Sequence, residues 1–351
     1  MARLWLVYLD TNVYIELTHA KTAAARVCLA ACRSAKASAR ALFPLSYALF
    51  SELLEQCRSD GPIARGALMD ELSEGVSFRG TQHVYDIEAR AAFPMLFGKP
   101  ALEPDRRELF TYVGNCLGDW SLRLPTLPPN WTDDATRTLM AQVRSSDAFN
   151  SVSWWLANHD LEAHRAGHEN ILRRHRQQSA DSYARAAECA RNPDGKLNKR
   201  KALLQEQLTI FKMRVLPALI RLLVEGRPAD EAGALLFKAQ RALGEGSEQR
   251  LGELMRAMPA TGLCGEVHAM RVMNPSRRYR DEDFWDVEHV MVPPVYADAF
   301  VTLDRELADI LRRSEAPSRR GCRILSSLNG LTDWLCERGL ASTTSRGTDN
   351  K

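Results

Sequence analysis

The first 39 residues of the chain show two distinct patterns of apolar and polar positions. Residues 4–9 form an uninterrupted apolar run that stops at Asp10-Thr11-Asn12, a pattern typical of a strand buried on both faces of a parallel sheet. Residues 13–39 are rich in Ala and carry apolar side chains at helical spacing, so they predict a helix after the strand. Strands that alternate with helices indicate the α/β class of fold.

The same alternation continues to about residue 95 and returns after residue 275. It predicts further strands at 41–45, 76–78, 299–303 and 323–325, and helices that follow Ser46 or span about 62–72, 282–291, 305–313 and 330–338. Residues 96–275 differ, because long helical patterns rich in Arg and Ala replace the apolar runs. We therefore expect a small parallel sheet flanked by helices. This domain would comprise residues 1–95 and 276–340, with a mainly helical insertion at 96–275 and a disordered tail at 341–351.

Composition narrows the class of protein. The 351 residues are 45% hydrophobic and 26% charged, which excludes collagen, low-complexity disorder and a small disulfide-rich scaffold. Eight cysteines occur without a Cys-x-x-Cys pair, so neither a zinc knuckle nor a disulfide framework is indicated. The sequence shows no signal peptide and no membrane-spanning run, and it predicts a soluble cytoplasmic protein without a membrane partner.

Four acidic residues occupy informative positions in this pattern. Asp10 and Asp304 each follow a buried strand, and ligand sites in open α/β sheets form at the carboxyl ends of the strands. Glu52 lies on the helix after the second strand. Asp286 lies on the helix before the strand at 299–303. We expect these four carboxylates to converge at one edge of the sheet.

Several carboxylates at one place raise one another's pKa unless a cation balances their charge. Oxygen ligands suit Mg²⁺ or Mn²⁺, which also bind phosphate oxygens. Such a site polarises a phosphodiester and lowers the pKa of a bound water, which then acts as the nucleophile. The acidic positions thus predict a metal-dependent phosphodiesterase site.

At these positions the chain resembles the PIN-domain nucleases. The similarity rests on Tyr8-Leu9-Asp10-Thr11-Asn12, on Ser51-Glu52-Leu53-Leu54, on Asp283-Phe-Trp-Asp286-Val-Glu-His289, and on Tyr296-Ala297-Asp298-Ala-Phe-Val-Thr302-Leu-Asp304. The resemblance implies a Mg²⁺- or Mn²⁺-dependent endoribonuclease that hydrolyses single-stranded RNA, or less commonly DNA. It is compatible with a toxin or defence role, an inhibitor protein as partner, and a homodimer. Most PIN domains are far shorter, so the resemblance does not explain the insertion.

The resemblance also assigns roles to individual residues. It implies that Asp10, Glu52, Asp286 and Asp304 are the catalytic metal ligands, in that order. Residues expected to support or replace them are Asp283 as a competitor of Asp286, Thr302 near phosphate or water, Asp298 in the cluster or as a strand cap, and Asn12. For His289 we expect a hydrogen bond to Asp286 or to phosphate rather than direct ligation, because the carboxylates already satisfy a small hard cation.

Basic residues in and after the insertion are candidates for binding the nucleic acid. The net charge of the chain is only +3, but residues 161–215 carry twelve Arg and Lys against six acids. An ordinary charged helical surface is an equally good interpretation. Side chains that would follow a phosphate backbone are Arg173, Arg174, Arg176, Lys199, Arg200, Lys201, Arg277, Arg278 and Arg280.

Other interpretations compete with the nuclease. The acids would be simple helix caps in a non-catalytic PIN-like module that binds a protein. A phosphatase with Asp10 as nucleophile would need a second acid where Asn12 stands. The histidines at 159, 164, 168 and 175 lack the spacing of a zinc protease motif. Trp154 and Trp155 are more simply a core residue and its neighbour than a platform for bases.

Overall fold

The computed structural model describes residues 3–55, 61–113, 150–158, most of 180–234, 247–274 and 282–341, together with Arg173 and Gln177. This part of the chain is mostly helical and contains a small parallel sheet, which agrees with the α/β class. The strands are β1 (Trp5–Leu9), β2 (Ala41–Leu42), β3 (Val76–Phe78), β4 (Phe110–Tyr112), β5 (Ala299–Val301) and β6 (Arg323–Leu325). The α-helices are α1 (Thr11–His19), α2 (Ala23–Ala37), α3 (Tyr47–Glu55), α4 (Gly61–Ser73), α5 (Thr81–Ala92), α8 (Val152–Asn158), α10 (Lys199–Ile210), α11 (Leu216–Val224), α13 (Ser247–Ala257), α14 (Pro259–Val272), α15 (Glu282–Met291), α16 (Pro293–Tyr296), α17 (Arg305–Arg313), α18 (Glu315–Arg320) and α19 (Leu328–Glu337). Short 3₁₀ turns are η1 (Phe93–Phe97) and η2 (Arg106–Leu109), and a π-helical turn is η4 (Phe211–Val215).

The main sheet has the strand order β2-β1-β5-β6, and all of its strands run parallel. Val7, Tyr8 and Leu9 of β1 are fully buried, as the continuous apolar run predicted. The Asp10 N–H donates to the Val301 carbonyl at 2.9 Å, which continues the β1–β5 pairing to the ends of both strands. The carboxyl ends of these strands therefore meet at one edge of the sheet.

The structure corrects several predicted elements. The strands β2 and β5 are shorter than expected and end at Leu42 and Val301. The single helix expected at 13–39 is two helices, because Ala20 adopts a left-handed conformation and Thr22 caps α2 by accepting the Ala25 N–H. The strand β3 does not join the main sheet but pairs antiparallel with β4, an element absent from the sequence interpretation. The predicted bounds of α15, α17, β3 and β6 are confirmed.

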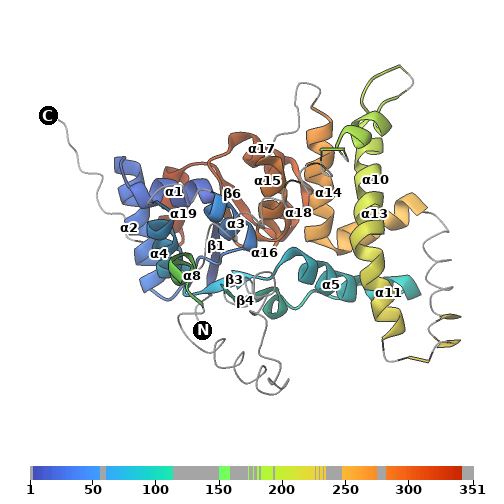
Figure 1. The fold of residues 1–351 in the computed structure, drawn as a ribbon, viewed down its shortest axis with the longest axis horizontal. Helices are drawn as coiled ribbons and strands as arrows, with labels where there is room; N and C mark the ends of the chain where they lie inside the picture. Colours follow the sequence, from blue (N-terminus) through green and yellow to red (C-terminus); the bar gives the residue numbers. More distant parts are fainter. Residues whose placement is uncertain are drawn as a thin grey trace.

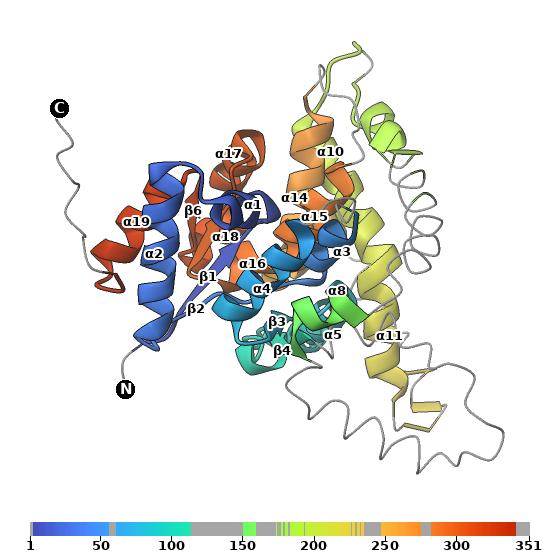
Figure 2. The ribbon, with the colours of Figure 1, turned by 60° about the vertical axis from the view of Figure 1, so that its left-hand side comes forward.

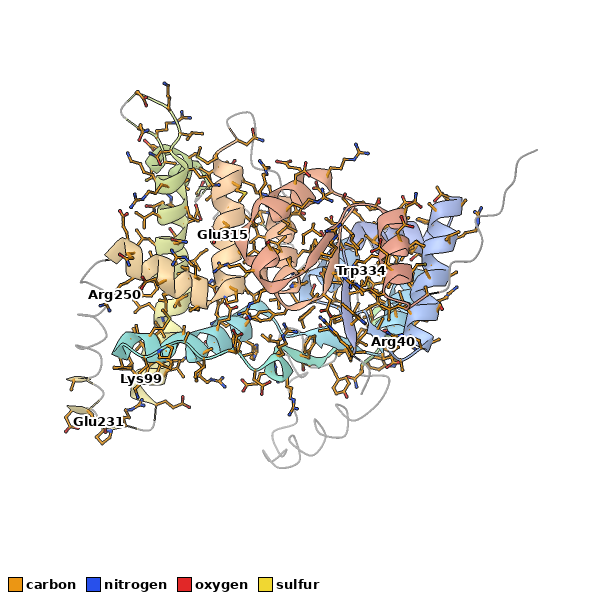
Figure 3. The ribbon with its side chains drawn as sticks, turned by 180° about the vertical axis from the view of Figure 1, so that it is seen from behind. Arg40, Lys99, Glu231, Arg250, Glu315 and Trp334 are labelled. Atoms are coloured by element: carbon orange, nitrogen blue, oxygen red, sulfur yellow. The ribbon has the colours of Figure 1, made fainter. Side chains whose placement is uncertain are left out.

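Helices cover the sheet on both sides. The helices α2 and α19 pack together on one side. On the other side lie α16, which precedes β5, and α17 and α18, which connect β5 to β6 (Figure 2). At the sheet end, the rings of Trp5 and Trp334 meet edge to face at 5.6 Å. In Figure 3, Trp334 and Arg40 mark this end of the molecule, and Arg250 on α13 marks the opposite end. Within the described part of the chain, every helix is too short or too polar to cross a lipid bilayer.

The remaining helices extend the molecule away from the sheet. One long helical run comprises α10, η4 and α11. Pro217, in the first turn of α11 just after the π-helical turn, lacks the N–H that a continuous α-helix would use. The helix α14 packs on both α10 and α15 (Figure 1). One hydrophobic core joins strand β1 to side chains of α11, α13 and α14, among them Leu219, Leu254 and Leu263. Part of segment 96–275 thus packs directly on the sheet-bearing part.

Candidate metal centre

Asp10 lies at the carboxyl end of β1 and is held by two hydrogen bonds. Its Oδ1 accepts the Thr11 N–H at 2.8 Å, and its Oδ2 accepts the Thr302 hydroxyl at 2.7 Å. Only 5% of the residue is exposed. Asp10 is also the N-cap of α1, so the end of a buried strand and the start of a helix fix the carboxylate together.

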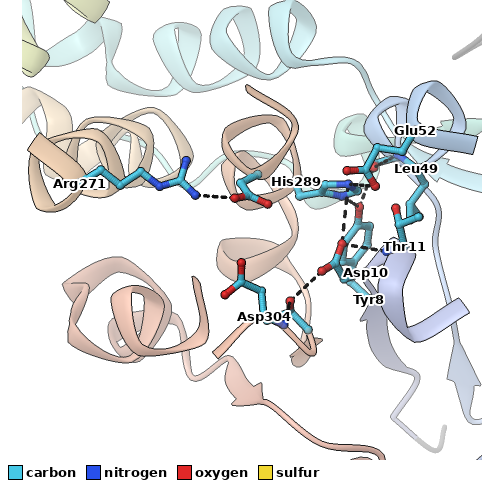
Figure 4. Close-up of polar contacts among 11 residues, drawn as sticks. Tyr8, Asp10, Thr11, Leu49, Glu52, Arg271, His289 and Asp304 are labelled. Carbon is cyan, nitrogen blue, oxygen red and sulfur yellow. Dashed lines mark hydrogen bonds and ion pairs between the residues drawn. The ribbon is translucent and has the colours of Figure 1, made fainter. Parts of the chain in front are cut away.

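Glu52 on α3 and His289 on α15 complete a group around Asp10 (Figure 4). The His289 Nε2 lies 3.0 Å from Glu52 Oε2 and 3.7 Å from Asp10 Oδ1. One potential ligand atom from each of the three residues lies within 4.8 Å of the others, a group that could hold a metal ion. The chain brings these residues together from three segments separated by up to 279 positions of sequence.

A chain of buried hydroxyls orients the imidazole. The Tyr8 hydroxyl lies 2.6 Å from His289 Nδ1 and 2.7 Å from the Ser46 Oγ. Burial raises the pKa of Tyr8 well above its ordinary value, which keeps the phenol neutral. With Nδ1 occupied in this way, Nε2 is the nitrogen that faces the carboxylates.

The charges of the group depend on one another. Burial opposes ionisation of His289, but Glu52 and Asp10 outweigh it and raise the imidazole pKa to about 9. Burial would also raise the pKa of Glu52, yet the charge and hydrogen bond of His289 bring it below the ordinary value. Burial raises the pKa of Asp10, and the Glu52 charge adds to that shift. The two carboxylates are therefore balanced here by a protonated imidazole, and a divalent cation would supply the same balance.

Two of the expected acidic ligands make other contacts beside this group, close enough that the charges of Asp10, Asp304 and His289 act on the Asp286 carboxyl. The Asp286 carboxylate accepts a 2.6 Å hydrogen bond from Arg271 Nη2 on α14. Burial raises the Asp286 pKa to about 6 although Arg271 opposes the shift. Asp304 caps α17, since its Oδ1 accepts the Leu307 N–H at 3.0 Å. Asp10 and Glu52 thus lie in one group with His289, while beside it Asp286 forms an ion pair and Asp304 caps a helix. Ligation of an ion by all four carboxylates stays a prediction.

The supporting residues also fall into different places. The Thr302 hydroxyl donates to Asp10 and accepts the Asp304 N–H at 3.1 Å, so it ties β5 to the group from within the protein. Asp298 precedes β5 and lies at the opposite edge of the sheet, where it accepts the Leu6 N–H and pairs with Arg3. It caps a strand and does not join the cluster. The side chain of Asn12 is exposed, and that of Asp283 lies outside the described residues.

The predicted basic surface is only partly described. Lys199, Arg200 and Lys201 are exposed at the start of α10, and Arg200 pairs with Glu248 at 2.9 Å. Arg173 is exposed as well. The helix α10 packs on α14 rather than beside the metal-binding group. Outside the described residues lie Arg174, Arg176, Arg277, Arg278, Arg280 and the histidines at 159, 164, 168 and 175.

Sequence reasoning did not find Tyr8, Ser46 or Arg271. Tyr8 sits inside an apolar run and reads as a core residue, and Arg271 occupies a helix without any distinguishing motif. His289 was found, but its expected partners were Asp286 or phosphate, and in the structure its partners are Glu52, Asp10 and Tyr8.

Comparison with protein-family models, with curated protein sequences and with solved structures finds no match to this chain. A function assigned to the group of Asp10, Glu52 and His289 therefore depends on its geometry and on the sequence motifs around it.

Proposed function

We propose that the protein is a metal-dependent endonuclease that hydrolyses phosphodiester bonds of single-stranded RNA. The observation that supports this proposal is the convergence of Asp10, Glu52 and His289 at the carboxyl edge of a parallel sheet. Ligand sites of open α/β sheets form at this edge. The resemblance of the surrounding motifs to PIN-domain nucleases supports RNA as the substrate and Mg²⁺ or Mn²⁺ as the metal.

Different residues of the chain would bind the metal, orient its ligands and contact the nucleic acid. Asp10, Glu52 and His289 would hold the cation, which when bound supplies Lewis-acid activation of a phosphodiester and of water. Thr302 fixes Asp10, and Tyr8 fixes the ring of His289, so both ligands are oriented before substrate arrives. Exposed basic side chains such as Lys199 and Lys201 would contact the phosphate backbone at a distance from the reacting bond.

Cleavage of labelled oligonucleotides tests this proposal directly. The purified chain is incubated with single-stranded RNA and with single-stranded DNA of the same sequence, in buffer with Mn²⁺ or Mg²⁺. We expect RNA cleavage that Asp10→Asn reduces by at least about a hundredfold, because even residues that only support a metal ligand typically contribute 10- to 100-fold. Asp333→Asn, the same change at an exposed position on α19, is the matched control and should cleave normally.

Three outcomes have clear meanings. Cleavage of DNA in preference to RNA would change the substrate and keep the chemistry. Undiminished cleavage by Asp10→Asn would refute the proposed centre. A protein that cleaves neither polymer with either metal would contradict the nuclease.

A non-catalytic binding module is the second candidate, and one observation favours it. Asp10 and Asp304 both cap helices, a structural role that needs no metal. Thermal unfolding with and without saturating Mn²⁺ separates the candidates, since an ion that binds only the folded protein must raise its stability. Absence of both a thermal shift and cleavage would favour the binding module.

A further inference from the structure

Arg271 and Asp286 form a nearly buried ion pair at the border of the metal-binding group. Their side chains are 3% and 19% exposed, and the Arg271 Nη2 to Asp286 Oδ2 distance is 2.6 Å. Figure 4 shows Arg271 reaching toward α15 from the side of α14, away from Asp10 and Glu52. If the pair separated, each of the two nearly buried charges would lose its partner, which is strongly unfavourable. The fold therefore stabilises the contact between Asp286 and Arg271.

His289, unlike Asp286, is oriented toward Asp10 and Glu52. Its ring is fixed through Nδ1 by the Tyr8 hydroxyl, and its Nε2 lies within 3.7 Å of carboxylate oxygens of both Glu52 and Asp10. A metal-binding histidine typically has one ring nitrogen anchored by a hydrogen bond while the other binds the metal, and here that second nitrogen is Nε2, beside the two carboxylates.

Thr11 gives a second and independent indication of a ligand at this place. Its hydroxyl is buried and makes no hydrogen bond of normal length with the protein, although it lies near enough to Glu52 to help lower the pKa of that carboxyl. Figure 4 shows Thr11 beside Asp10 and Glu52. Buried hydroxyls are almost always hydrogen-bonded, so an unsatisfied one beside the Glu52 carboxylate points to a bound ion or its water.

We propose that His289 takes the place of Asp286 as the third metal ligand, and that Arg271 is the positioning residue that holds the neighbouring Asp286 carboxylate in an ion pair rather than on the ion. The proposal deepens the proposed function and rests on it for the purpose of the metal. One nitrogen and two carboxylate ligands favour first-row transition ions, whereas Mg²⁺ strongly prefers oxygen. The centre should therefore select an ion such as Mn²⁺ over Mg²⁺.

Pulsed electron paramagnetic resonance of the full chain loaded with Mn²⁺ tests the ligation. The expected result is a nitrogen-14 coupling from an imidazole bound to Mn²⁺, which His289→Asp removes. His19→Asp, at an exposed position in the last turn of α1, is the matched control and should keep the coupling. A wild-type protein that binds Mn²⁺ without any nitrogen coupling would overturn the proposal, and this measurement does not depend on whether the variant folds.

Thermal titrations with Mn²⁺ and with Mg²⁺ test the selectivity. We expect the ratio of the two midpoint concentrations to favour Mn²⁺ in the wild type and to fall roughly tenfold in His289→Asp, which makes the centre all oxygen. Arg271→Met should shift the ratio in the same direction, because it releases the Asp286 carboxylate. Arg271→Lys keeps the charge and should shift the ratio less. An unchanged ratio in both His289→Asp and Arg271→Met would contradict the proposal.

The outcomes also separate this proposal from the nuclease. Nitrogen coupling without cleavage of any polymer would keep the ligation by His289 and reject the nuclease. Cleavage that Mg²⁺ and Mn²⁺ support equally, without nitrogen coupling, would keep the nuclease and reject the ligation by His289.

Discussion

The carboxylate of Glu88 and the carboxylates of Asp10 and Glu52 lie in two regions of the protein and differ in the groups that face their oxygen atoms. Glu88 on α5 is fully buried, and each of its oxygens accepts two hydrogen bonds. The four donors are the Ala260 N–H, the Thr261 N–H, the Thr261 hydroxyl and the Tyr296 hydroxyl, at 2.5–2.9 Å. At the sheet edge, each Asp10 oxygen accepts only one such hydrogen bond from the described residues, and Asp10 also faces the charged side chains of Glu52 and His289.

The difference teaches how a structural carboxylate can be told from a ligand carboxylate. Around Glu88 the protein supplies four neutral donors, and two of them are N–H groups in the first turn of α14. Burial still raises the Glu88 pKa, but these hydrogen bonds oppose the shift, and within the described part of the chain no second charged group faces the carboxylate. Around Asp10 the protein leaves like charges together and balances them with a single imidazolium, which a cation can replace. Burial alone does not distinguish the two, since Asp10, His289 and Glu88 are all nearly inaccessible.

Replacing Glu88 should produce the largest loss of stability. Glu88→Ala leaves two backbone N–H groups and two hydroxyls without their acceptor, and we expect a loss of about 4 kcal/mol in the free energy of unfolding. Urea unfolding measures this loss, and Glu88→Gln, which keeps the size of the side chain, should lose less. The thermal shift caused by Mn²⁺ should persist in Glu88→Gln. A loss below about 1 kcal/mol in Glu88→Ala would show that the network does not hold α5, α14 and α16 together.

Glu206 on α10 offers a third environment, with burial as the only influence on its charge. Burial raises its pKa to about 7 from 4.5. Below pH 4.5 the carboxyl is protonated in both states. Between pH 4.5 and 7 only the unfolded chain ionises, so stability falls as pH rises through this window. We expect Glu206→Gln to remove this fall and to be more stable than the wild type at pH 8 by roughly 2 to 3 kcal/mol.

Urea unfolding of both proteins at pH 4 and pH 8 checks this sign. Glu248→Gln, at an exposed site that pairs with Arg200, is the control and should change stability by less than about 1 kcal/mol at either pH. A difference between wild type and Glu206→Gln that is the same at both values would contradict the raised pKa.

The sequence carried enough information for the sheet and for part of the site. The uninterrupted apolar runs identified β1 and β5, and the parallel order of the strands placed Asp10 and Asp304 at one edge. Helical spacing also located α15 and hence His289. These features follow from local patterns, which is why a single sequence predicts them.

The rest depended on packing between distant segments. No local pattern shows that Arg271 of α14 reaches α15, so the withdrawal of Asp286 into an ion pair could not be predicted. Tyr8 was similarly hidden, because a buried tyrosine in a strand has the same pattern whether or not its hydroxyl meets His289. β4 is three residues long, and its pairing with β3 depends on the long-range fold.

Replacing Asp304 tests whether this residue is only a helix cap or also a metal ligand, and we expect a smaller change in stability than at Glu88 or Glu206. Its Oδ1 accepts the Leu307 N–H at the start of α17, so Asp304→Ala should cost about 1 kcal/mol of unfolding free energy. Asp304→Asn keeps a good capping oxygen and should cost only about a few tenths. If the structural role is complete, Asp304→Asn keeps the Mn²⁺ thermal shift. Loss of that shift in the stable Asn variant would return Asp304 to the list of ligands.

Asp10 is the central residue of the proposed metal centre, and we expect its replacement to change the stability of the metal-free protein least. Asp10→Asn keeps an oxygen that can accept the Thr11 N–H and places an amide NH2 against the Thr302 hydroxyl, which can accept from it after rotating. The change also removes a charge whose burial is unfavourable, but it loses the attraction to His289. These contributions offset one another, so we expect the free energy of unfolding without metal to change by less than about 1 kcal/mol. The Mn²⁺ thermal shift should disappear in this variant and remain in Asp333→Asn. A loss of several kcal/mol without metal would instead place Asp10 with Glu88 among the structural carboxylates, because it would mean that the fold, rather than a ligand, depends on its charge.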